Sequence, residues 1–144
     1  MIWSAKPNLE ILNAVGQNNM TGHLGIEFIE AGDDYLKATM PVDERTKQPM
    51  GLLHGGASAV LAETMGSVAS MLTLKNVATQ GVVGIEINAN HLSSAKSGKV
   101  IGTVKPIKIG RTLQVWDIQI EDEKGKKICI SRLTTMIIST DKKA

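Results

Sequence analysis

The fold is decided by residues 54–74, which read HGGASAVLAETMGSVASMLTL. Apolar residues recur in this stretch at spacings of three and four, which is the pattern of one α-helix. These residues are Ala57, Val60, Leu61, Met65, Val68, Ala69 and Leu72. Because they cover much of the helix circumference, we expect the helix to be largely buried.

The segments on either side of this helix change to a period of two, which predicts β-strands. The expected strands lie around residues 26–28 and over residues 35–42, 82–92, 99–107, 113–121 and 126–138. A short helix with Asn8 as its N-cap is expected before the first strand, and a frayed polar tail is expected over residues 139–144.

About six strands and one long apolar helix can bury their apolar faces efficiently in one arrangement. The sheet curls round the helix, which buries its apolar faces there and satisfies its backbone hydrogen bonds internally. We therefore predict an α+β fold with one domain over residues 1–144. In it, a curved antiparallel sheet of about six strands wraps round one long central helix.

Length and composition narrow the class of protein. The apolar share of 42% and the charged share of 21% are typical of a soluble globular domain. The net charge of +2 gives little attraction for nucleic acid, and the longest apolar run is too short to span a membrane. The single cysteine excludes an internal disulfide, and the opening residues lack the apolar core of a secretion signal. We expect a cytoplasmic protein without a membrane or nucleic-acid partner.

Several common catalytic motifs are absent from the sequence. There is no GxSxG nucleophile turn, no P-loop and no GxGxxG after a strand. The histidines His23, His54 and His91 share no metal-ligand spacing, so neither a metal site nor a cofactor is expected. Cys129 lies in an apolar run and is predicted to be a core residue.

The start of the long helix is unusual. The sequence QPMGLLHGG of residues 48–56 offers no Ser, Thr, Asp or Asn at the expected cap, so the first N–H groups lack an obvious side-chain partner. It also carries Gly55 and Gly56, although glycine costs about 0.5–1 kcal/mol relative to alanine inside a helix. Both features are explained if a ligand oxygen approaches these N–H groups. The alternative is a junction whose glycines only allow tight packing.

The second unusual feature is Glu63, a carboxylate in the middle of the most apolar helix. Such a charge is costly to bury unless it is paired, hydrogen-bonded or functional. Ser67 and Ser70 follow at spacings of four and seven, so the three side chains are expected to form one polar stripe. The alternative is that this stripe faces solvent or a polar subunit interface.

His54 and Glu63 lie nine residues apart, which corresponds to about 13 Å of helical rise and a half-turn of rotation. The two side chains therefore cannot meet at one reacting atom within one chain. If both serve one site, the helix start comes from one subunit and Glu63 from another. A two-fold dimer with antiparallel helices side by side would form two such sites.

Several motifs at fixed spacing resemble those of one family. They are GLLHGG at residues 51–56 with Glu63, and the segments MIW (1–3), MPVD (40–43), RTKQP (45–49), EINANH (86–91) and SRLTT (131–135). Together they resemble the hotdog-fold acyl-CoA thioesterases that hydrolyse aromatic acyl-CoA esters, over nearly the whole chain. The resemblance implies a hydroxybenzoyl-CoA or dihydroxynaphthoyl-CoA type of substrate, no cofactor, and a homodimer that forms a dimer of dimers.

The resemblance also implies roles for individual residues. Glu63 matches the catalytic carboxylate, which acts as a nucleophile or as a general base on water, and Ser67 matches a hydroxyl group that positions water or Glu63. Gly55 matches the residue whose N–H faces the thioester carbonyl, and Gln48 and His54 match the residues that hold this carbonyl and orient the site.

Substrate and CoA contacts are implied for further segments. They comprise Gly84, the strand end His91, Leu92, Ser93 and Ser94, the loop Lys108, Ile109, Gly110 and Arg111, and the pocket-wall residues Val68 and Met71. Lys96, Lys108 and Arg111 are candidates for the CoA phosphates, although a loop lysine can be merely solvated. His91 could equally be a structural histidine.

Two alternative functions remain at this point. A hotdog hydratase or dehydratase also places a carboxylate or histidine beside an acyl thioester, but the spacing from His-Gly-Gly to Glu63 fits the thioesterases better. A non-catalytic acyl-CoA-binding module is the other alternative. Simple binding does not require a carboxylate in an apolar helix, which disfavours this second alternative.

Overall fold

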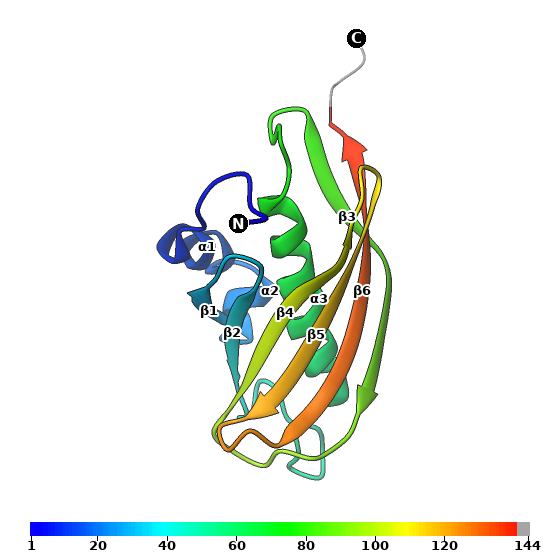
Figure 1. Ribbon diagram of the computed structural model, residues 1–144. Coiled ribbons are helices and arrows are strands. Elements are labelled where there is room, and N and C mark those ends of the chain that lie inside the picture. The colour runs from blue at the N-terminus through cyan, green and yellow to red at the C-terminus, as the bar shows by residue number, and fades with distance from the viewer. Residues whose placement is uncertain (141–144) are drawn as a thin grey trace.

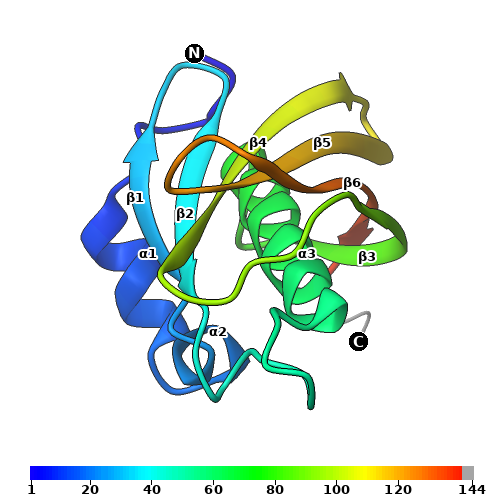
Figure 2. The same cartoon turned by 90° about the horizontal axis from the view of Figure 1, so that it is seen from below.

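The computed structural model describes residues 1–140 and shows six antiparallel strands curled round one long helix (Figures 1 and 2). The helices are α1 (Leu9–Gly16), α2 (Met20–His23) and α3 (Gly55–Leu72). The strands are β1 (Glu27–Ala31), β2 (Leu36–Pro41), β3 (Gln80–His91), β4 (Lys99–Ile109), β5 (Leu113–Asp122) and β6 (Lys127–Ser139). The sheet order is β1-β2-β4-β5-β6-β3, so the predicted α+β hotdog fold is confirmed.

Several predicted boundaries need correction. The four-residue helix α2 was not predicted, because its sequence is too short to show a period. Ser139 belongs to β6 rather than to a tail, since it pairs with Gln80, whereas residues 141–144 lie outside the described part of the chain. β4 runs on to Ile109, two residues past its predicted end, because a register shift after Pro106 lets the pairing with β5 continue. The predicted cap of α1 is confirmed by the Asn8 side chain, which accepts from the Ile11 N–H at 3.1 Å.

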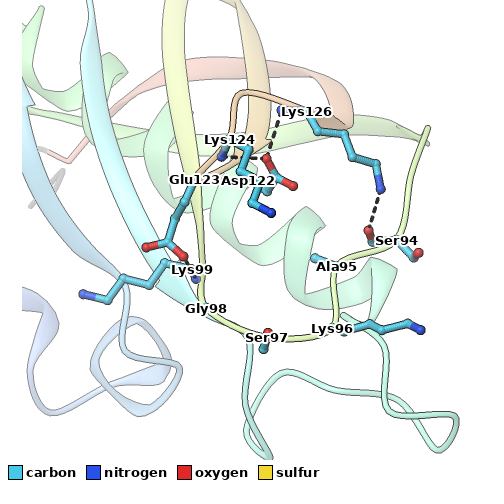
Figure 3. Close-up of a pocket in the computed structure, with 10 residues that line it drawn as sticks. All are labelled: Ser94, Ala95, Lys96, Ser97, Gly98, Lys99, Asp122, Glu123, Lys124 and Lys126. Atoms are coloured by element: carbon cyan, nitrogen blue, oxygen red, sulfur yellow. Dashed lines mark hydrogen bonds between the residues drawn. The ribbon is translucent and has the colours of Figure 1, made fainter.

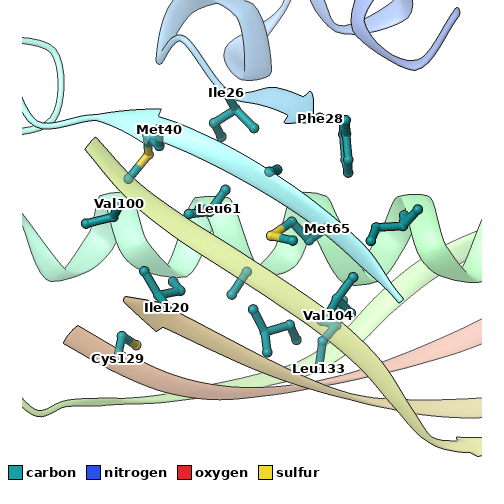
Figure 4. Close-up of a cluster of buried hydrophobic side chains, with 14 of the residues drawn as sticks. Ile26, Phe28, Met40, Leu61, Met65, Val100, Val104, Ile120, Cys129 and Leu133 are labelled. Carbon is teal, nitrogen blue, oxygen red and sulfur yellow. The ribbon is translucent and has the colours of Figure 1, made fainter. Parts of the chain in front are cut away.

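The helix α3 lies very close to the concave face of the sheet (Figure 4). Two glycines make this approach possible. A methyl group at Gly66 would lie 2.5 Å from Leu133 Cδ2, and one at Gly102 would lie 2.4 Å from Met65 Sδ. The core between helix and sheet includes Cys129, whose predicted core position is confirmed and whose thiol pKa is raised by burial.

A buried hydrogen-bond network ties α3 to the sheet. Trp116 Nε1 donates to Ser70 Oγ at 2.7 Å, and Ser70 Oγ lies 2.6 Å from Thr135 Oγ1. A fully buried indole N–H needs such a partner. Ser70 therefore faces the sheet and does not share a polar stripe with Glu63, which corrects the sequence prediction. A spacing of seven residues does put the two side chains on nearly the same face of α3, but at Ser70 this face lies against Trp116 and Thr135 of the sheet, whereas Glu63 is exposed.

The first residues of the chain close one end of the core. Trp3 is buried and stacks on Trp116 with ring centroids 6.4 Å apart. Its Nε1 donates to the Gly32 carbonyl at 2.7 Å, and the Ser4 N–H donates to the Leu72 carbonyl at 2.8 Å. Within residues 1–140 we find no helix with the length and apolar character needed to cross a membrane.

Candidate active site

The loop before α3 is held by its own backbone hydrogen bonds. The Gln48 N–H donates to the Leu52 carbonyl at 2.8 Å, and the Gly51 N–H donates back to the Gln48 carbonyl at 2.9 Å. Gly51 has a φ of 78°, which only glycine adopts at little cost. The His54 N–H then donates to the carbonyl oxygen of the buried Thr46 at 2.8 Å. The loop therefore brings Gln48 and His54 together at the start of α3.

His54 is the N-cap of α3. Its Nδ1 accepts a hydrogen bond from the Gly56 N–H at 2.8 Å, which corrects the expectation that no side chain caps this helix. Ring nitrogens of histidine were not considered as cap acceptors, yet an unprotonated Nδ1 can serve. The ring proton is then on Nε2, which can donate to a ligand. No hydrogen bond from the Gly55 N–H is found within residues 1–140, so this donor stays available as predicted.

The side chain of Gln48 is also oriented by a backbone N–H group of its own loop. Its Oε1 accepts from the Met50 N–H at 2.5 Å, so the amide oxygen is already engaged within the loop. The amide Nε2 is then the end that can donate to a substrate carbonyl. The helix start thus presents three hydrogen-bond donors from one chain, which are the Gly55 N–H, His54 Nε2 and Gln48 Nε2.

His91, at the end of β3, lies directly over Gly55. A methyl group at Gly55 would lie 2.7 Å from His91 Nε2 and 2.9 Å from Cε1. The side chain of His91 is exposed, so it is a wall of the helix start rather than a core histidine. The structure therefore brings His91 against Gly55 at the start of α3, although the two lie in distant segments of the sequence.

Glu63 lies on an exposed part of α3 in the single chain. It borders a hollow of about 380 Å³ between α2 and α3. The hollow is lined by Met20, Thr21, Val60, Glu63, Thr64, Ser67 and Val68. Ser67 and Val68 thus lie beside Glu63 as predicted, whereas Met71 lines a separate hollow beside α1.

Sequence reasoning missed Met20 and Thr21 at this hollow. No signal in the sequence links a four-residue helix to the middle of α3, because the contact depends on how α1 and α2 fold back beside β1.

The remaining predicted site residues lie at opposite ends of the sheet. β3 ends at one end, where His91 and the following Leu92, Ser93 and Ser94 lie (Figure 1). The turn between β4 and β5, with Gly110 and Arg111, lies at the other end, and Lys108 and Ile109 belong to the last part of β4. A single chain therefore does not bring the two groups together.

Beyond Ser94 lies a polar pocket of about 380 Å³, shown in Figure 3. It contains the side chains of Lys96, Lys99, Lys124 and Lys126. Its two carboxylates already accept backbone hydrogen bonds. Asp122 Oδ1 accepts from the N–H groups of Lys126 and Lys124, both at 2.9 Å, which lowers the pKa of Asp122, and Glu123 Oε2 accepts from the Lys99 N–H at 3.3 Å.

The four lysines outnumber the two carboxylates of the pocket. In Figure 3 the Lys96 and Lys99 side chains extend in opposite directions, and Lys126 Nζ donates to the Ser94 carbonyl at 3.2 Å. Sequence reasoning identified only Lys96 among these lysines. The place of Lys124 and Lys126 beside Ser94 follows from the pairing of β5 and β6, which local sequence patterns do not show. Within residues 1–140, no cluster of three or more His, Cys, Asp or Glu side chains could hold a metal ion.

Comparisons with known proteins show the family of this chain. Residues 50–129 match the family model of the thioesterase superfamily. The chain is 59% identical over 138 residues to the 1,4-dihydroxy-2-naphthoyl-CoA hydrolase of Escherichia coli K12, covering 96% of this chain and 100% of that protein. A mutant thioesterase of Pseudomonas aeruginosa has a TM-score of 0.94 at 47% identity, covering 96% of this chain and 99% of that one. This chain belongs to the thioesterase superfamily and is a thioester hydrolase.

Two further solved structures are of one Staphylococcus aureus protein, which one of them describes as a thioesterase enzyme. Both are 36% identical to this chain, with TM-scores of 0.81 and 0.79, and cover 84% and 82% of it and 99% and 97% of their own chains. One carries alanine in place of a glutamate and the other in place of a glutamine. The replaced glutamine precedes the replaced glutamate by 15 residues.

Proposed function

We propose that this protein hydrolyses an aromatic acyl-CoA thioester, of the 1,4-dihydroxy-2-naphthoyl-CoA or hydroxybenzoyl-CoA type, to the free acid and CoA. The observation that carries the proposal is the Gly55 N–H, for which no acceptor is found within residues 1–140, at a helix start where the Gly56 and Met50 N–H groups orient the side chains of His54 and Gln48. The named substrate of the Escherichia coli relative is an aryl-CoA ester, which supports the aromatic class.

In the proposed reaction the thioester carbonyl oxygen accepts from the Gly55 N–H, where the helix dipole favours developing negative charge. His54 Nε2 and Gln48 Nε2 are additional donors to the substrate. Glu63 either attacks the carbonyl carbon or removes a proton from an attacking water, and Ser67 positions that water or the carboxylate. If Glu63 removes a proton from water, the hydroxide adds to the carbonyl carbon, the carbon–sulfur bond breaks, and the CoA thiolate takes up a proton. If Glu63 attacks, the carbon–sulfur bond breaks to leave an acyl–Glu63 anhydride, which water then hydrolyses to the free acid and the restored carboxylate.

The spacing of Gln48 and Glu63 supports their assignment. They lie 15 residues apart, the same separation as the glutamine and glutamate replaced in the Staphylococcus aureus protein. Each of those residues was chosen for replacement by alanine in a chain of the same fold. The matched spacing therefore supports a pair of working residues at these two positions.

We propose a homodimer as the smallest active unit. Gly55 and Glu63 lie eight residues apart on α3, or about 12 Å along its axis, so one chain does not direct both at one carbonyl. β3 is a 12-residue edge strand, and the exposed fractions of its Val83 and Ile85 side chains are 37% and 50%. Antiparallel pairing of two β3 strands would cover this edge and set the two α3 helices side by side.

The same pairing explains the two groups of CoA-contact residues. In an antiparallel pair, the β4–β5 turn of one protomer lies towards the β3 end of its partner. Arg111 and Lys108 of one chain would then approach His91 and Ser94 of the other. A dimer of two such dimers is the full assembly that we propose.

The lysine pocket beyond Ser94 is the proposed place for the CoA phosphates. It begins three residues after His91, so it continues the path from Gly55 along the strand end. Lys96, Lys124 and Lys126 would contact the phosphates, with Lys108 and Arg111 of the partner approaching from the second side. Such contacts add binding energy far from the reacting carbon, so they act on KM more than on kcat.

A thiol-release assay tests the proposal. The purified protein is given a panel of benzoyl-type, naphthoyl-type and aliphatic CoA esters and carrier-protein thioesters, and kcat/KM is measured for each. We expect turnover with the highest kcat/KM for aromatic CoA esters. Stoichiometric binding without thiol release would show a binding module instead, and addition of water to an enoyl-CoA with the thioester intact would show a hydratase.

A further inference from the structure

Gly84 carries no side chain at a position where the backbone does not require glycine. The glycines with positive φ within residues 1–140 are Gly25, Gly51, Gly98 and Gly125, so Gly84 has a conformation that other residues adopt freely. Glycine inside a strand is also unfavourable, since it loses entropy and adds no packing. The reason for glycine here must lie in what approaches it.

The group that approaches Gly84 is the carboxylate of Glu63. A methyl group at Gly84 would lie 2.6 Å from Glu63 Oε1 and 3.6 Å from its Cδ, within the same chain. The first distance is far shorter than any normal contact between a methyl carbon and an oxygen. Glu63 and any side chain at this position therefore cannot both occupy their places.

The backbone around Gly84 is held more firmly than the exposed carboxylate of Glu63. Thr135 lies opposite Gly84 in β6 and is hydrogen-bonded to Ser70 of α3, so the helix and sheet are tied together at this level. The register with β6 shifts immediately after Gly84, which leaves Ile85 without a partner and bends β3 beside Glu63. The backbone of α3 is therefore held to the sheet near Gly84, so a methyl group there would displace the Glu63 carboxylate rather than the helix.

We propose that Gly84 is a positioning residue whose missing side chain forms the seat of the Glu63 carboxylate. The seat holds the carboxylate against the β3 backbone and limits its rotamers, so that its oxygen faces the substrate carbonyl in one geometry. This proposal rests on the proposed function, in which Glu63 is the catalytic carboxylate. It differs from the role that the family resemblance implies for Gly84, which is contact with the substrate.

The test is Gly84→Ala. We expect kcat to fall at least about tenfold, because a displacement of about 1 Å can cost up to 10²-fold in rate, whereas KM changes less than about threefold. The matched control is Gly81→Ala in the same strand. A methyl group there meets the flexible Thr140 and Ile138 side chains at 3.0 and 3.6 Å and not Glu63, so kcat should be retained.

A double variant that also changes Glu63 distinguishes loss of the seat from a general structural effect of the Gly84→Ala substitution. Glu63→Asp shortens the side chain by one methylene and lowers kcat by itself. Because the shorter side chain leaves the seat, we expect the double variant Gly84→Ala/Glu63→Asp to be no slower than Glu63→Asp alone. Losses that multiply would overturn the proposal. If Gly84→Ala does not fold, the double variant should fold, since it lacks the contact; failure of both would also overturn the seat.

A crystal structure of Gly84→Ala gives a readout that does not depend on turnover. We expect the Glu63 carboxylate to move by more than about 1 Å, with the α3 backbone in place. A raised KM with unchanged kcat and an unmoved carboxylate would show that Gly84 contacts the substrate instead. If the wild-type protein hydrolyses no thioester, the proposed function fails, while the displaced carboxylate would still show the seat.

Discussion

The candidate site has a donor half, made of Gln48, His54 and Gly55 at the helix start, and a carboxylate half at Glu63 in the middle of α3. The two halves are held in different ways. At the helix start, the Gly56 N–H binds His54 Nδ1 and the Met50 N–H binds Gln48 Oε1, so the donors are oriented before any ligand arrives. At the middle of α3, no hydrogen bond to the Glu63 side chain is found within residues 1–140, and its carboxylate lies against Gly84. The proposed donors all lie on one chain, and in the proposed dimer the carboxylate that faces them comes from the second chain.

The largest expected effect comes from removing the charge of the carboxylate half. In Glu63→Gln the side chain keeps its size but can neither attack the carbonyl nor accept a proton from water, so kcat should fall by about 10²-fold or more. Steady-state thiol release measures this loss. Circular dichroism and size-exclusion chromatography should match wild type, because Glu63 is exposed in the single chain. A kcat within about threefold of wild type would contradict the assignment.

The donor half is tested by Gly55→Ala. The substitution keeps the N–H group but places a methyl group 2.7 Å from His91 Nε2, so the imidazole must move. We expect kcat/KM to fall about tenfold, whereas the melting temperature should be retained, because His91 is exposed and its imidazole can move without disturbing the core.

The double variant Gly55→Ala/His91→Ala identifies the cause of that loss. If the methyl group acts by displacing His91, the double variant should be as active as His91→Ala alone. If the methyl group instead blocks the substrate, the two losses should multiply. That outcome would exclude a role for His91 in the donor half.

Mixed dimers test whether the halves come from different chains. Gln48→Ala/His54→Ala damages the donor half, and Glu63→Ala damages the carboxylate half, so each homodimer has no intact site. In a mixed dimer one site carries both lesions and the other is intact. Random 1:1 reassembly makes about half the dimers mixed, so roughly a quarter of wild-type activity should return. A tagged pull-down checks that mixed dimers form, and their presence without recovered activity would show that each site is built within one chain.

The smallest effect is expected at the lysine pocket. Lys124→Ala/Lys126→Ala should raise KM for CoA esters about three- to fivefold, because the proposed phosphate contacts add binding energy far from the reacting carbon. KM for pantetheine esters should stay nearly unchanged, since these esters lack the nucleotide and its phosphates. Lys108→Ala/Arg111→Ala is the matched pair at the other end of the sheet. Equal effects of a pair on both ester types would exclude a nucleotide contact for that pair.

Much of the fold follows from local pattern. The apolar spacing in α3 and the period of two in the strands depend only on neighbouring residues, so both were predictable. Ser70 shows the limit of this reasoning. Its spacing from Glu63 suggested a shared stripe, but the neighbouring Trp116 and Thr135, 46 and 65 residues away, draw its hydroxyl into the core.

The candidate site likewise contains residues that were predictable from the sequence and residues that were not. Residues 48–56 and Glu63 stood out in the sequence because glycines and a carboxylate are costly in a helix. His54 as a cap, the seat at Gly84 and the place of Met20 beside Glu63 did not stand out. Each depends on contacts between segments that only packing brings together.

The sequence by itself determined the long buried helix, the strands that surround it and the separation of His54 from Glu63 along that helix, because rise and periodicity are properties of local geometry. Only the tertiary structure decided which polar groups already have hydrogen-bond partners and which side chains lie against glycines. Those facts arise where β3 lies against α3, at Gly55 beneath His91 and at Gly84 beneath Glu63, and the distance between two packed elements is set by the whole core.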